Sequence, residues 1–209
     1  MNRSKDETRD VYNTIADHFS ETRANPWPEV MDFIDGIDAV QTGIDIGCGN
    51  GRHLNPLANK VQVPIGIDVS EQLLKIAQKR VDEATLLVGD ATRLPLAAGS
   101  VDAAIYVATI HHLPTAADRL QSLNEIARIL QSDGTALVSA WSTEHSRFDK
   151  TESFDTTLEW TLPDGEIKTR FFHIYSPADF KRTIEESALE LKEMEVSSGN
   201  CYATVGTTE

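Results

Sequence analysis

The segment Asp45-Ile46-Gly47-Cys48-Gly49-Asn50-Gly51 constrains the fold more than any other part of the sequence. It follows a short apolar run, TGIDIG, and precedes a segment that we expect to be helical from about Arg52. Glycines at such a junction let the backbone turn sharply and approach a ligand closely, and the amino end of a helix attracts negative charge. A strand, a Gly-rich turn and a helix in this order are typical of a ligand site at the edge of a parallel sheet.

The rest of the chain repeats the same alternation of short apolar strands and amphipathic helices up to residue 141. Before the Gly-rich turn, Val11, Ile15 and Phe19 recur at spacing four and predict a helix over 6–20. A second helix is expected from Pro26 to near Gly36. After the first strand (42–47) we predict strands at 63–69, 84–88, 101–107 and 135–141, and helices at 71–80 and 116–131, the last one capped by Gly134.

The pattern changes after residue 141. Residues 143–155 are polar and predict a loop, and the turn signal Pro163-Asp164-Gly165 separates alternating segments 157–162 and 166–175, which predict a hairpin. A helix at 177–188 and two strands at 190–196 and 201–206 follow. We therefore expect one domain over 1–209, an α/β fold with a mostly parallel sheet, N-terminal helices within 6–36, an insertion at about 143–175 and a terminal antiparallel hairpin.

Three carboxylates narrow the class of ligand. Asp68 ends the second strand, where an acid can accept both ribose hydroxyls. Asp90, followed by Ala91, comes after the third strand and can reach the exocyclic amine of adenine. Asp45 is poorly suited to a pyrophosphate but useful near a cationic ligand. Together with Gly47, Gly49, Gly51 and Val107 at the end of the fourth strand, these residues form the predicted cofactor set.

S-adenosyl-L-methionine fits these acids, because it carries an ammonium and a sulfonium group and no phosphate. The sequence therefore predicts a class I methyltransferase, a Rossmann-like fold with a seven-stranded sheet. A dehydrogenase-like site is the alternative, but its GxGxxG normally lies very near the amino terminus, whereas about 40 residues precede the turn here. A fold that only binds or activates a partner is disfavoured because all three acids and all three glycines are present.

The charge balance bears on partners. There are 33 acidic residues against 19 Lys and Arg, a net charge of -14. A diffuse negative surface repels nucleic acid and acidic membranes, which favours a small-molecule substrate; adaptation to a salt-rich cytoplasm, as in a halophile, is the other explanation. Cys48 and Cys201 form neither a disulfide framework nor a zinc-type pair, so we expect a reducing cytoplasm and no metal. No window of the sequence is apolar over the length needed to cross a bilayer, so we expect no membrane association.

Three further segments make the prediction narrower. Residues 12–30, 110–130 and 170–175 (RFFHIY) resemble the tRNA wobble-uridine carboxymethyl methyltransferase family, which includes the yeast enzyme and the methyltransferase domain of a human AlkB homologue. The resemblance covers almost the whole chain. It implies an archaeal member that esterifies a carboxymethyl group on the wobble uridine of the tRNA anticodon stem-loop, together with a small zinc-binding activator protein. One departure is Cys201, where the family usually has Trp after Asn.

A carboxylate substrate sets the chemistry that the site needs. Its pKa is roughly 4, so it is ionised at neutral pH and needs no general base. The protein instead has to orient it, and a guanidinium can hold it bidentately. The catalytic candidates are Arg23, His111, Arg170 and His173, and the substrate-binding candidates are Arg23, Trp27, His112, Arg170 and Asn200.

Each candidate has a plainer interpretation. The arginines can form surface ion pairs, Trp27 can pack in the core, one of the two adjacent histidines can cap a loop, and Asn200 can serve a turn. The alternative function is a small-molecule methyltransferase acting on a quinone, sterol or carboxylic acid. A last prediction concerns the strand Ala84-Thr85-Leu86-Leu87-Val88, which lies at a sheet edge in the doubly wound order and has no Lys or Pro to guard it. We expect the activator to dock there by strand addition.

Overall fold

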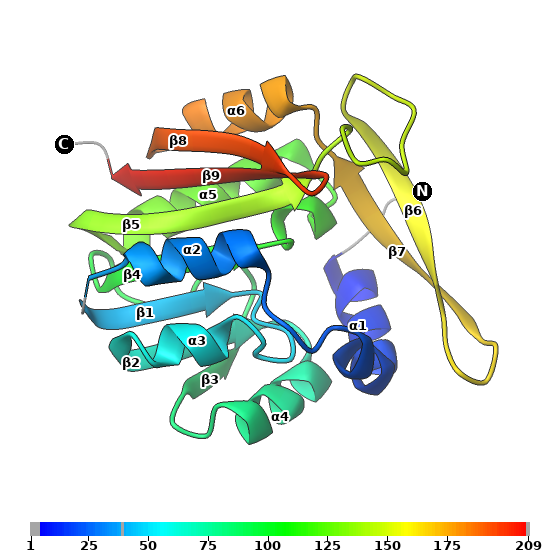
Figure 1. Ribbon diagram of the computed structural model, residues 1–209, viewed down its shortest axis with the longest axis horizontal. Coiled ribbons are helices and arrows are strands. Elements are labelled where there is room, and N and C mark those ends of the chain that lie inside the picture. The colour runs from blue at the N-terminus through cyan, green and yellow to red at the C-terminus, as the bar shows by residue number, and fades with distance from the viewer. Residues whose placement is uncertain (1–4, 39, 208–209) are drawn as a thin grey trace.

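The computed structural model describes residues 5–38 and 40–207 (Figure 1). Its helices are α1 (Lys5–Thr22), α2 (Pro28–Gly36), α3 (Leu54–Ala58), α4 (Glu71–Arg80), α5 (Ala116–Ile129) and α6 (Pro177–Glu185), with a 3-10 turn, η1 (Ile110–His112). Its strands are β1 (Val40–Ile46), β2 (Val61–Asp68), β3 (Thr85–Val88), β4 (Val101–Val107), β5 (Leu130–Trp141), β6 (Phe154–Thr161), β7 (Ile167–Ile174), β8 (Leu189–Ser197) and β9 (Asn200–Thr207).

The main sheet has seven strands in the order β3-β2-β1-β4-β5-β9-β8. The first five strands of this order are parallel, and β9 pairs antiparallel with both β5 and β8. The predicted mostly parallel sheet with a terminal antiparallel hairpin is therefore confirmed. The strand order reverses between β1 and β4, and ligands of open α/β sheets bind at the carboxyl ends of the strands at such a point.

Alternating side chains divide the core between the two faces of the sheet. On β4, Ala104 and Tyr106 join the cluster that contains α5 and α6, whereas Ile105 and Val107 join the cluster under α2 and α3. Strands buried on both faces lack the polar alternation of a half-exposed strand, which explains why the run VDAAIYV is apolar at every position except Asp102.

Gly134 and Pro26 do not have their predicted roles at the ends of helices. Gly134 does not cap a helix, because α5 ends at Ile129 and Leu130 is already extended, with φ −64° and ψ 142°. Gly134 lies within β5, where the register with β4 shifts between Val101 and Ala103. The second helix begins at Pro28 and not at Pro26, because Pro28 holds Trp27 extended, with ψ 145°.

The predicted hairpin at 157–162 and 166–175 is present as the separate two-stranded sheet β6–β7. Figure 1 shows this hairpin at the end of the molecule where the parallel strands finish, with α1 between it and the main sheet. Helix α1 contacts both α4 and β7. The N-terminal helix and the insertion, far apart in sequence, therefore meet above the carboxyl edge of the sheet.

Candidate functional site

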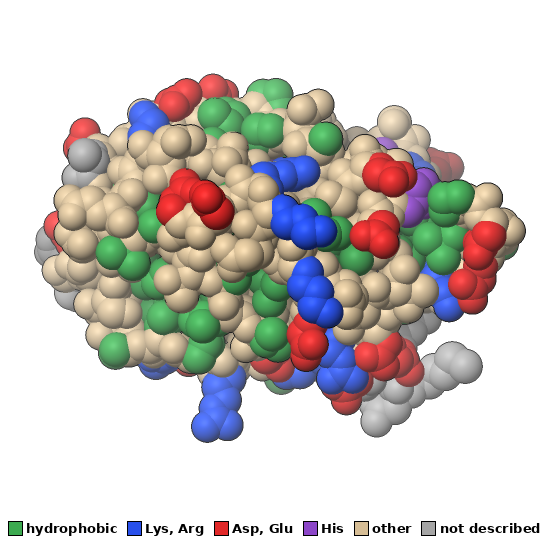
Figure 2. All heavy atoms as spheres, turned by 90° about the horizontal axis from the view of Figure 1, so that it is seen from below, with side chains coloured by type: hydrophobic (Ala, Val, Ile, Leu, Met, Phe, Trp, Pro, Cys, Tyr) green, Lys and Arg blue, Asp and Glu red, His purple; other side chains and the backbone are tan. Residues whose placement is uncertain are grey.

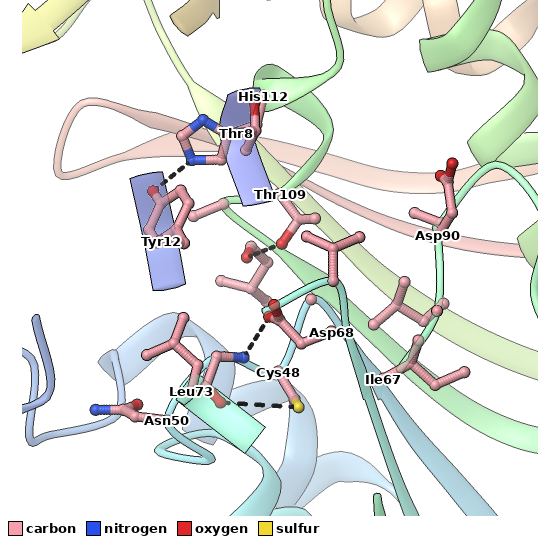
Figure 3. Close-up of a pocket in the computed structure, with 18 of the residues that line it drawn as sticks. Thr8, Tyr12, Cys48, Asn50, Ile67, Asp68, Leu73, Asp90, Thr109 and His112 are labelled. Atoms are coloured by element: carbon pink, nitrogen blue, oxygen red, sulfur yellow. Dashed lines mark hydrogen bonds between the residues drawn. The ribbon is translucent and has the colours of Figure 1, made fainter. Parts of the chain in front are cut away.

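A pocket lies at the carboxyl ends of β1, β2 and β4, under α1. Figure 3 shows Asp90 at one end of it and Asn50 at the other, with Asp68 between them. The lining combines the Gly-rich turn, the ends of the strands and one face of α1, and includes Lys5, Thr8, Tyr12, Phe19, Gly47, Cys48, Gly49, Asn50, Arg52, Asp68, Gly89, Asp90, Ala91, Val107, Thr109 and His112. Most of the predicted cofactor set is therefore gathered around one cavity.

The glycine turn has the conformation that its sequence requires. Gly47, Gly49 and Gly51 have φ of 72°, 53° and 76°, in the left-handed region that disfavours other residues. At Gly47 a Cβ atom would in addition collide with the side chain of Thr109. The turn therefore brings the backbone against the cavity in a way that no other residue type at position 47 allows.

Asp68 is fixed by the backbone around it. One carboxylate oxygen accepts from the N–H of Gly49 and the other from the N–H of Ser70, both at 2.8 Å. Burial raises the pKa of Asp68, and these backbone hydrogen bonds act against that rise. The second lone pairs of both oxygens remain available to a ligand, as two vicinal hydroxyls require.

Asp90 is held at the far end of the cavity by α1. Nζ of Lys5 lies 2.5 Å from its carboxylate, and Thr92 donates two further hydrogen bonds to the same side chain. Burial alone would raise the pKa of Asp90, but the hydrogen bonds from Lys5 and Thr92 lower it below its usual value. The carboxylate is therefore ionised and faces the end of the pocket assigned to the adenine amine.

Asp45 lies beside the pocket and is absent from its immediate lining. It is 2% exposed, and its Oδ2 has no hydrogen-bond partner within the described part of the chain. Burial raises its pKa to about 8, the charge of Asp68 acts in the same direction, and the charge of Arg52 opposes both. An unpartnered buried carboxylate oxygen fits an ammonium group, reached directly or through water.

Sequence reasoning missed the residues that α1 and its neighbours add. Lys5, Thr8, Tyr12 and Phe19 recur at helical spacing and form one face of α1 over the pocket. Arg52 is a lining cation whose guanidinium stacks 4.7 Å from the centre of the Trp27 ring. The predicted apolar stripe of Val11, Ile15 and Phe19 shares only Phe19 with this face, and no sequence signal marked its polar members as pocket residues.

The two candidate arginines meet around one aromatic ring. The guanidinium carbons of Arg170 and Arg23 lie 4.7 Å and 5.4 Å from the centre of the Trp160 ring. The indole N–H of Trp160 donates to His18 of α1, which fixes the ring. Arg170 also lies 5.2 Å from the Phe172 ring, and its Nη1 is 3.5 Å from the hydroxyl of Tyr12 in the pocket wall.

Neither arginine forms an ion pair with a carboxylate of the described residues. Arg23 donates to the carbonyl oxygen of Thr22, and Nε of Arg170 is buried without a hydrogen-bond partner. In a chain with 33 acidic residues, an unpaired buried guanidinium nitrogen is unexpected. Two guanidinium groups without carboxylate partners among the described residues therefore lie next to the pocket.

The two adjacent histidines have different surroundings. His112 lines the pocket and is hydrogen-bonded to Tyr12 and to the carbonyl oxygen of Phe171. His111 is 1% exposed, and its Nδ1 accepts from the backbone N–H of Trp141. Burial keeps the pKa of His111 well below its usual value and lowers that of His112 to about 3. Both rings are neutral near pH 7, and His111 is a structural support for η1.

Three predicted site residues lie elsewhere. His173 is on the opposite face of β7 from Arg170, because adjacent strand residues alternate, and it binds Asp155 at 2.7 Å. The Trp27 ring packs on Arg52 and His53 within the core under α2. Asn200 is 6% exposed in the β8–β9 hairpin, and its amide donates to the carbonyl oxygen of Ser198.

The described residues contain neither a membrane-spanning helix nor a cluster of metal ligands. No helix within residues 5–38 and 40–207 is long and apolar enough to cross a membrane. The same residues contain no group of three or more His, Cys, Asp or Glu side chains that could hold a metal ion.

Known proteins resemble this chain in sequence. A family model described as a methyltransferase domain matches residues 44–138. The tRNA (carboxymethyluridine(34)-5-O)-methyltransferase ALKBH8 of Mus musculus is 44% identical over 134 residues, which are 64% of this chain and 20% of that protein. The tRNA (carboxymethyluridine(34)-5-O)-methyltransferase of Saccharomyces cerevisiae is 36% identical over 164 residues, 77% of this chain and 58% of that protein. The chain thus spans about a fifth of the mouse relative and over half of the yeast relative.

Solved structures share the fold. A chain from a complex that contains the Haloferax volcanii Trm112 methyltransferase activator is similar with a TM-score of 0.75 and 18% identity, over 97% of this chain and 98% of that one. The DhpI-SAM-HEP complex is similar with a TM-score of 0.77 and 17% identity, over 98% and 99% of the two chains. Identities this low show the fold alone, and that fold is the predicted class I methyltransferase fold.

Proposed function

This chain belongs to the class I S-adenosylmethionine-dependent methyltransferases and is a homologue of the tRNA (carboxymethyluridine(34)-5-O)-methyltransferases, and we propose that it methylates the same chemical group. The acceptor is the carboxymethyl group of a wobble uridine in tRNA, and the product is its methyl ester. The observation that carries this proposal is the pair of arginines without acidic partners on Trp160, beside the pocket.

The pocket residues fit S-adenosylmethionine from end to end. Asp90 suits the adenine amine and Asp68 the ribose hydroxyls. Asp45, just behind the lining, has an unpartnered oxygen that suits the ammonium group, directly or through water. The cofactor supplies an electrophilic methyl group on a sulfonium. Arg52, close to the Gly-rich turn, provides a cation for the carboxylate of the methionine portion.

Methylation of a carboxylate requires the protein to orient the substrate and does not require a general base. One carboxylate oxygen of the substrate forms a bond to the methyl carbon while the bond from that carbon to sulfur breaks, and no proton is transferred. Arg170 and Arg23 hold the second oxygen, and the surrounding rings of Trp160 and Phe172 exclude water, which strengthens that interaction. His112 is neutral and already hydrogen-bonded on both nitrogens, in keeping with a reaction that needs no base.

An RNA substrate requires positive charge on an otherwise acidic chain. Figure 2 shows a row of Lys and Arg side chains across the middle of one face of the molecule, with acidic groups mostly to either side. Such a row can follow a phosphate backbone while the rest of the surface repels it. We propose that the protein meets its tRNA substrate in the cytoplasm.

The two edges of the sheet differ in a way that supports a protein partner at β3. Edge strand β8 carries Lys192, Glu193 and Glu195 and a register shift, which discourage pairing. Edge strand β3 has no charged residue, and Val88 is 58% exposed. We propose that the small zinc-binding activator adds a strand there, and the similarity to a chain from a complex with the Trm112 activator supports a partner of this kind.

The proposed function is tested with an anticodon stem-loop that carries carboxymethyluridine. Arg170→Ala should lower kcat/KM about 10- to 100-fold, because charge-assisted hydrogen bonds of this kind contribute about 1.5–3 kcal/mol, while cofactor affinity stays unchanged. Arg182→Ala, on the exposed side of α6, is the matched control. Methylation of the stem-loop at the parent rate by both Arg170→Ala and Arg23→Ala would overturn the arginine assignment. Mass spectrometry of anticodon nucleosides then identifies the product.

A further inference from the structure

Tyr12 of α1 is the centre of a hydrogen-bonded chain with a defined direction. Nδ1 of His112 lies 2.9 Å from the carbonyl oxygen of Phe171, which can only accept, so Nδ1 carries the proton of the neutral ring. Nε2 of His112 then has only a lone pair, and the hydroxyl of Tyr12, 2.8 Å away, donates to it (Figure 3). The oxygen of Tyr12 is left to accept from Nη1 of Arg170 at 3.5 Å.

Tyr12 belongs to the helix that covers the pocket. It lies on the same face of α1 as Lys5, Thr8 and Phe19, all of which line the cavity. Lys5 fastens one end of that face to Asp90 at the adenine end. A ligand that fills the cavity and contacts this face therefore acts on the position of the Tyr12 hydroxyl.

The other end of the chain of hydrogen bonds fixes β7. The carbonyl oxygen that His112 binds belongs to Phe171, the residue after Arg170. Through His112, Tyr12 thus joins three elements, α1, η1 and β7, and its oxygen contacts the guanidinium that carries the proposed substrate site. The hydroxyl of Tyr12 thus links α1, which covers the cofactor pocket, to Arg170 in the proposed anion site.

We propose that Tyr12 is a positioning residue that couples closure of α1 over the cofactor to the placement of Arg170 for the substrate carboxylate. The role of Arg170 in this inference rests on the proposed function. Because coupling between two sites is reciprocal, bound cofactor strengthens RNA binding by the same factor as bound RNA strengthens cofactor binding. This coupling favours RNA binding by enzyme molecules that already hold S-adenosylmethionine.

Tyr12→Phe separates this role from simple packing. The Tyr12 ring makes edge contacts with Phe19 and His112, and phenylalanine keeps that ring while it removes the hydroxyl. Thr14→Val is the matched control, because it removes a hydroxyl from an exposed position of the same helix that bonds only to the carbonyl oxygen of Asp10.

The first measurement is the Kd of the carboxymethylated stem-loop with and without S-adenosylhomocysteine. The parent and Thr14→Val should bind RNA about fivefold or more tightly when S-adenosylhomocysteine is present. In Tyr12→Phe that ratio should fall close to one, with KM for RNA raised and kcat little changed. An unchanged ratio in Tyr12→Phe, or a ratio of one in the parent, would overturn the proposal.

The second measurement needs no RNA and so separates this inference from the proposed function. Hydrogen exchange of the β7 amides should slow on addition of S-adenosylhomocysteine to the parent and not to Tyr12→Phe. His112→Asn gives a second variant, because its amide can replace Nδ1 at the Phe171 carbonyl but leaves Tyr12 without its acceptor. If S-adenosylhomocysteine slows exchange of the β7 amides in the parent but the stem-loop is not methylated, the proposed substrate is wrong and the coupling between α1 and β7 still holds. Equal protection in parent and both variants would refute the coupling itself.

Discussion

At the scale of single residues, Asp45 shows how burial in a ligand site opposes the ionisation of a carboxyl group. Burial raises its pKa to about 8, and the neighbouring charge of Asp68 adds to the rise. An aspartate in the unfolded chain has a pKa of about 4. Between about pH 4 and 8 the folded protein therefore binds the additional proton. The stability associated with protonated Asp45 is fully present below about pH 4 and is lost as pH rises through 8.

Asp45→Asn tests this balance. The variant should lose less stability between pH 6 and pH 8 than the parent, by roughly 2 kcal/mol, since each pH unit in this range changes the free energy of unfolding by up to about 1.4 kcal/mol. Urea unfolding at the two pH values measures the difference, with Asp82→Asn, an exposed site, as the control. Identical pH dependence in parent and Asp45→Asn would show that Asp45 ionises normally. The same substitution should weaken S-adenosylmethionine binding, because the amide cannot attract the ammonium group.

Cys48, in the Gly-rich turn, is a residue whose surroundings make its thiol unreactive. Burial raises the pKa of the Cys48 thiol well above its ordinary value, and the charges of Asp45 and Asp68 add to that rise. A thiol that stays protonated is a poor nucleophile. Cys48 therefore fills space within the turn.

At the scale of elements, the two edge strands of the main sheet differ in how well they are protected against pairing with another strand. Edge strand β8 is protected by charges and by an irregular register, whereas β3 is short, apolar and open. An unprotected edge exposes backbone donors and acceptors that another strand can satisfy. The contrast within one sheet is the physical basis for the proposal that the activator docks at β3.

Val88→Lys is the corresponding test. Because Val88 is 58% exposed, the substitution should leave the melting temperature of the isolated chain nearly unchanged while it prevents co-purification with the activator. Ile167→Lys, at a site 54% exposed on the β6–β7 hairpin, is the matched control and should retain the complex. If the complex survives Val88→Lys and also Thr85→Lys, the activator binds another surface.

At the scale of the whole molecule, the net charge of -14 governs stability and RNA binding in opposite directions. Mutual repulsion of the acidic residues opposes the compact state, and salt screens it. The same salt weakens the contacts of Lys and Arg with RNA phosphates. For a chain of this charge, high ionic strength favours folding and low ionic strength favours RNA binding, so both are met only at an intermediate value.

The melting temperature of the isolated chain should therefore rise between 0.1 and 2 M KCl, roughly the range over which the screening length falls below the spacing of surface charges. Differential scanning calorimetry measures the shift. Sucrose at equal osmolality serves as a control for effects other than screening. A melting temperature that stays constant or falls in KCl would speak against a salt-adapted surface.

Much of the fold could be read from the sequence because its signals are local. Helix α4 and strand β4 begin and end at their predicted residues. A serine cap precedes the helix, and the strand is a run that is apolar except for Asp102. Boundaries failed where a residue has two possible roles, as with Gly134, which can cap a helix or lie in an irregular strand. His173 was grouped with Arg170 by proximity in sequence, but strand alternation places the two on opposite faces.

The sequence by itself determined the order of strands and helices, the Gly-rich turn and the acid at the end of β2, because each depends on residues within one turn or strand. The tertiary structure alone decided which side chains complete the site. Tyr12 meets His112 across 100 residues of chain and Arg170 across 158, and Arg23 joins Arg170 only through the ring of Trp160. Such contacts depend on how α1 and the β6–β7 hairpin pack over the sheet edge, and that packing is set by the whole core and not by any short pattern.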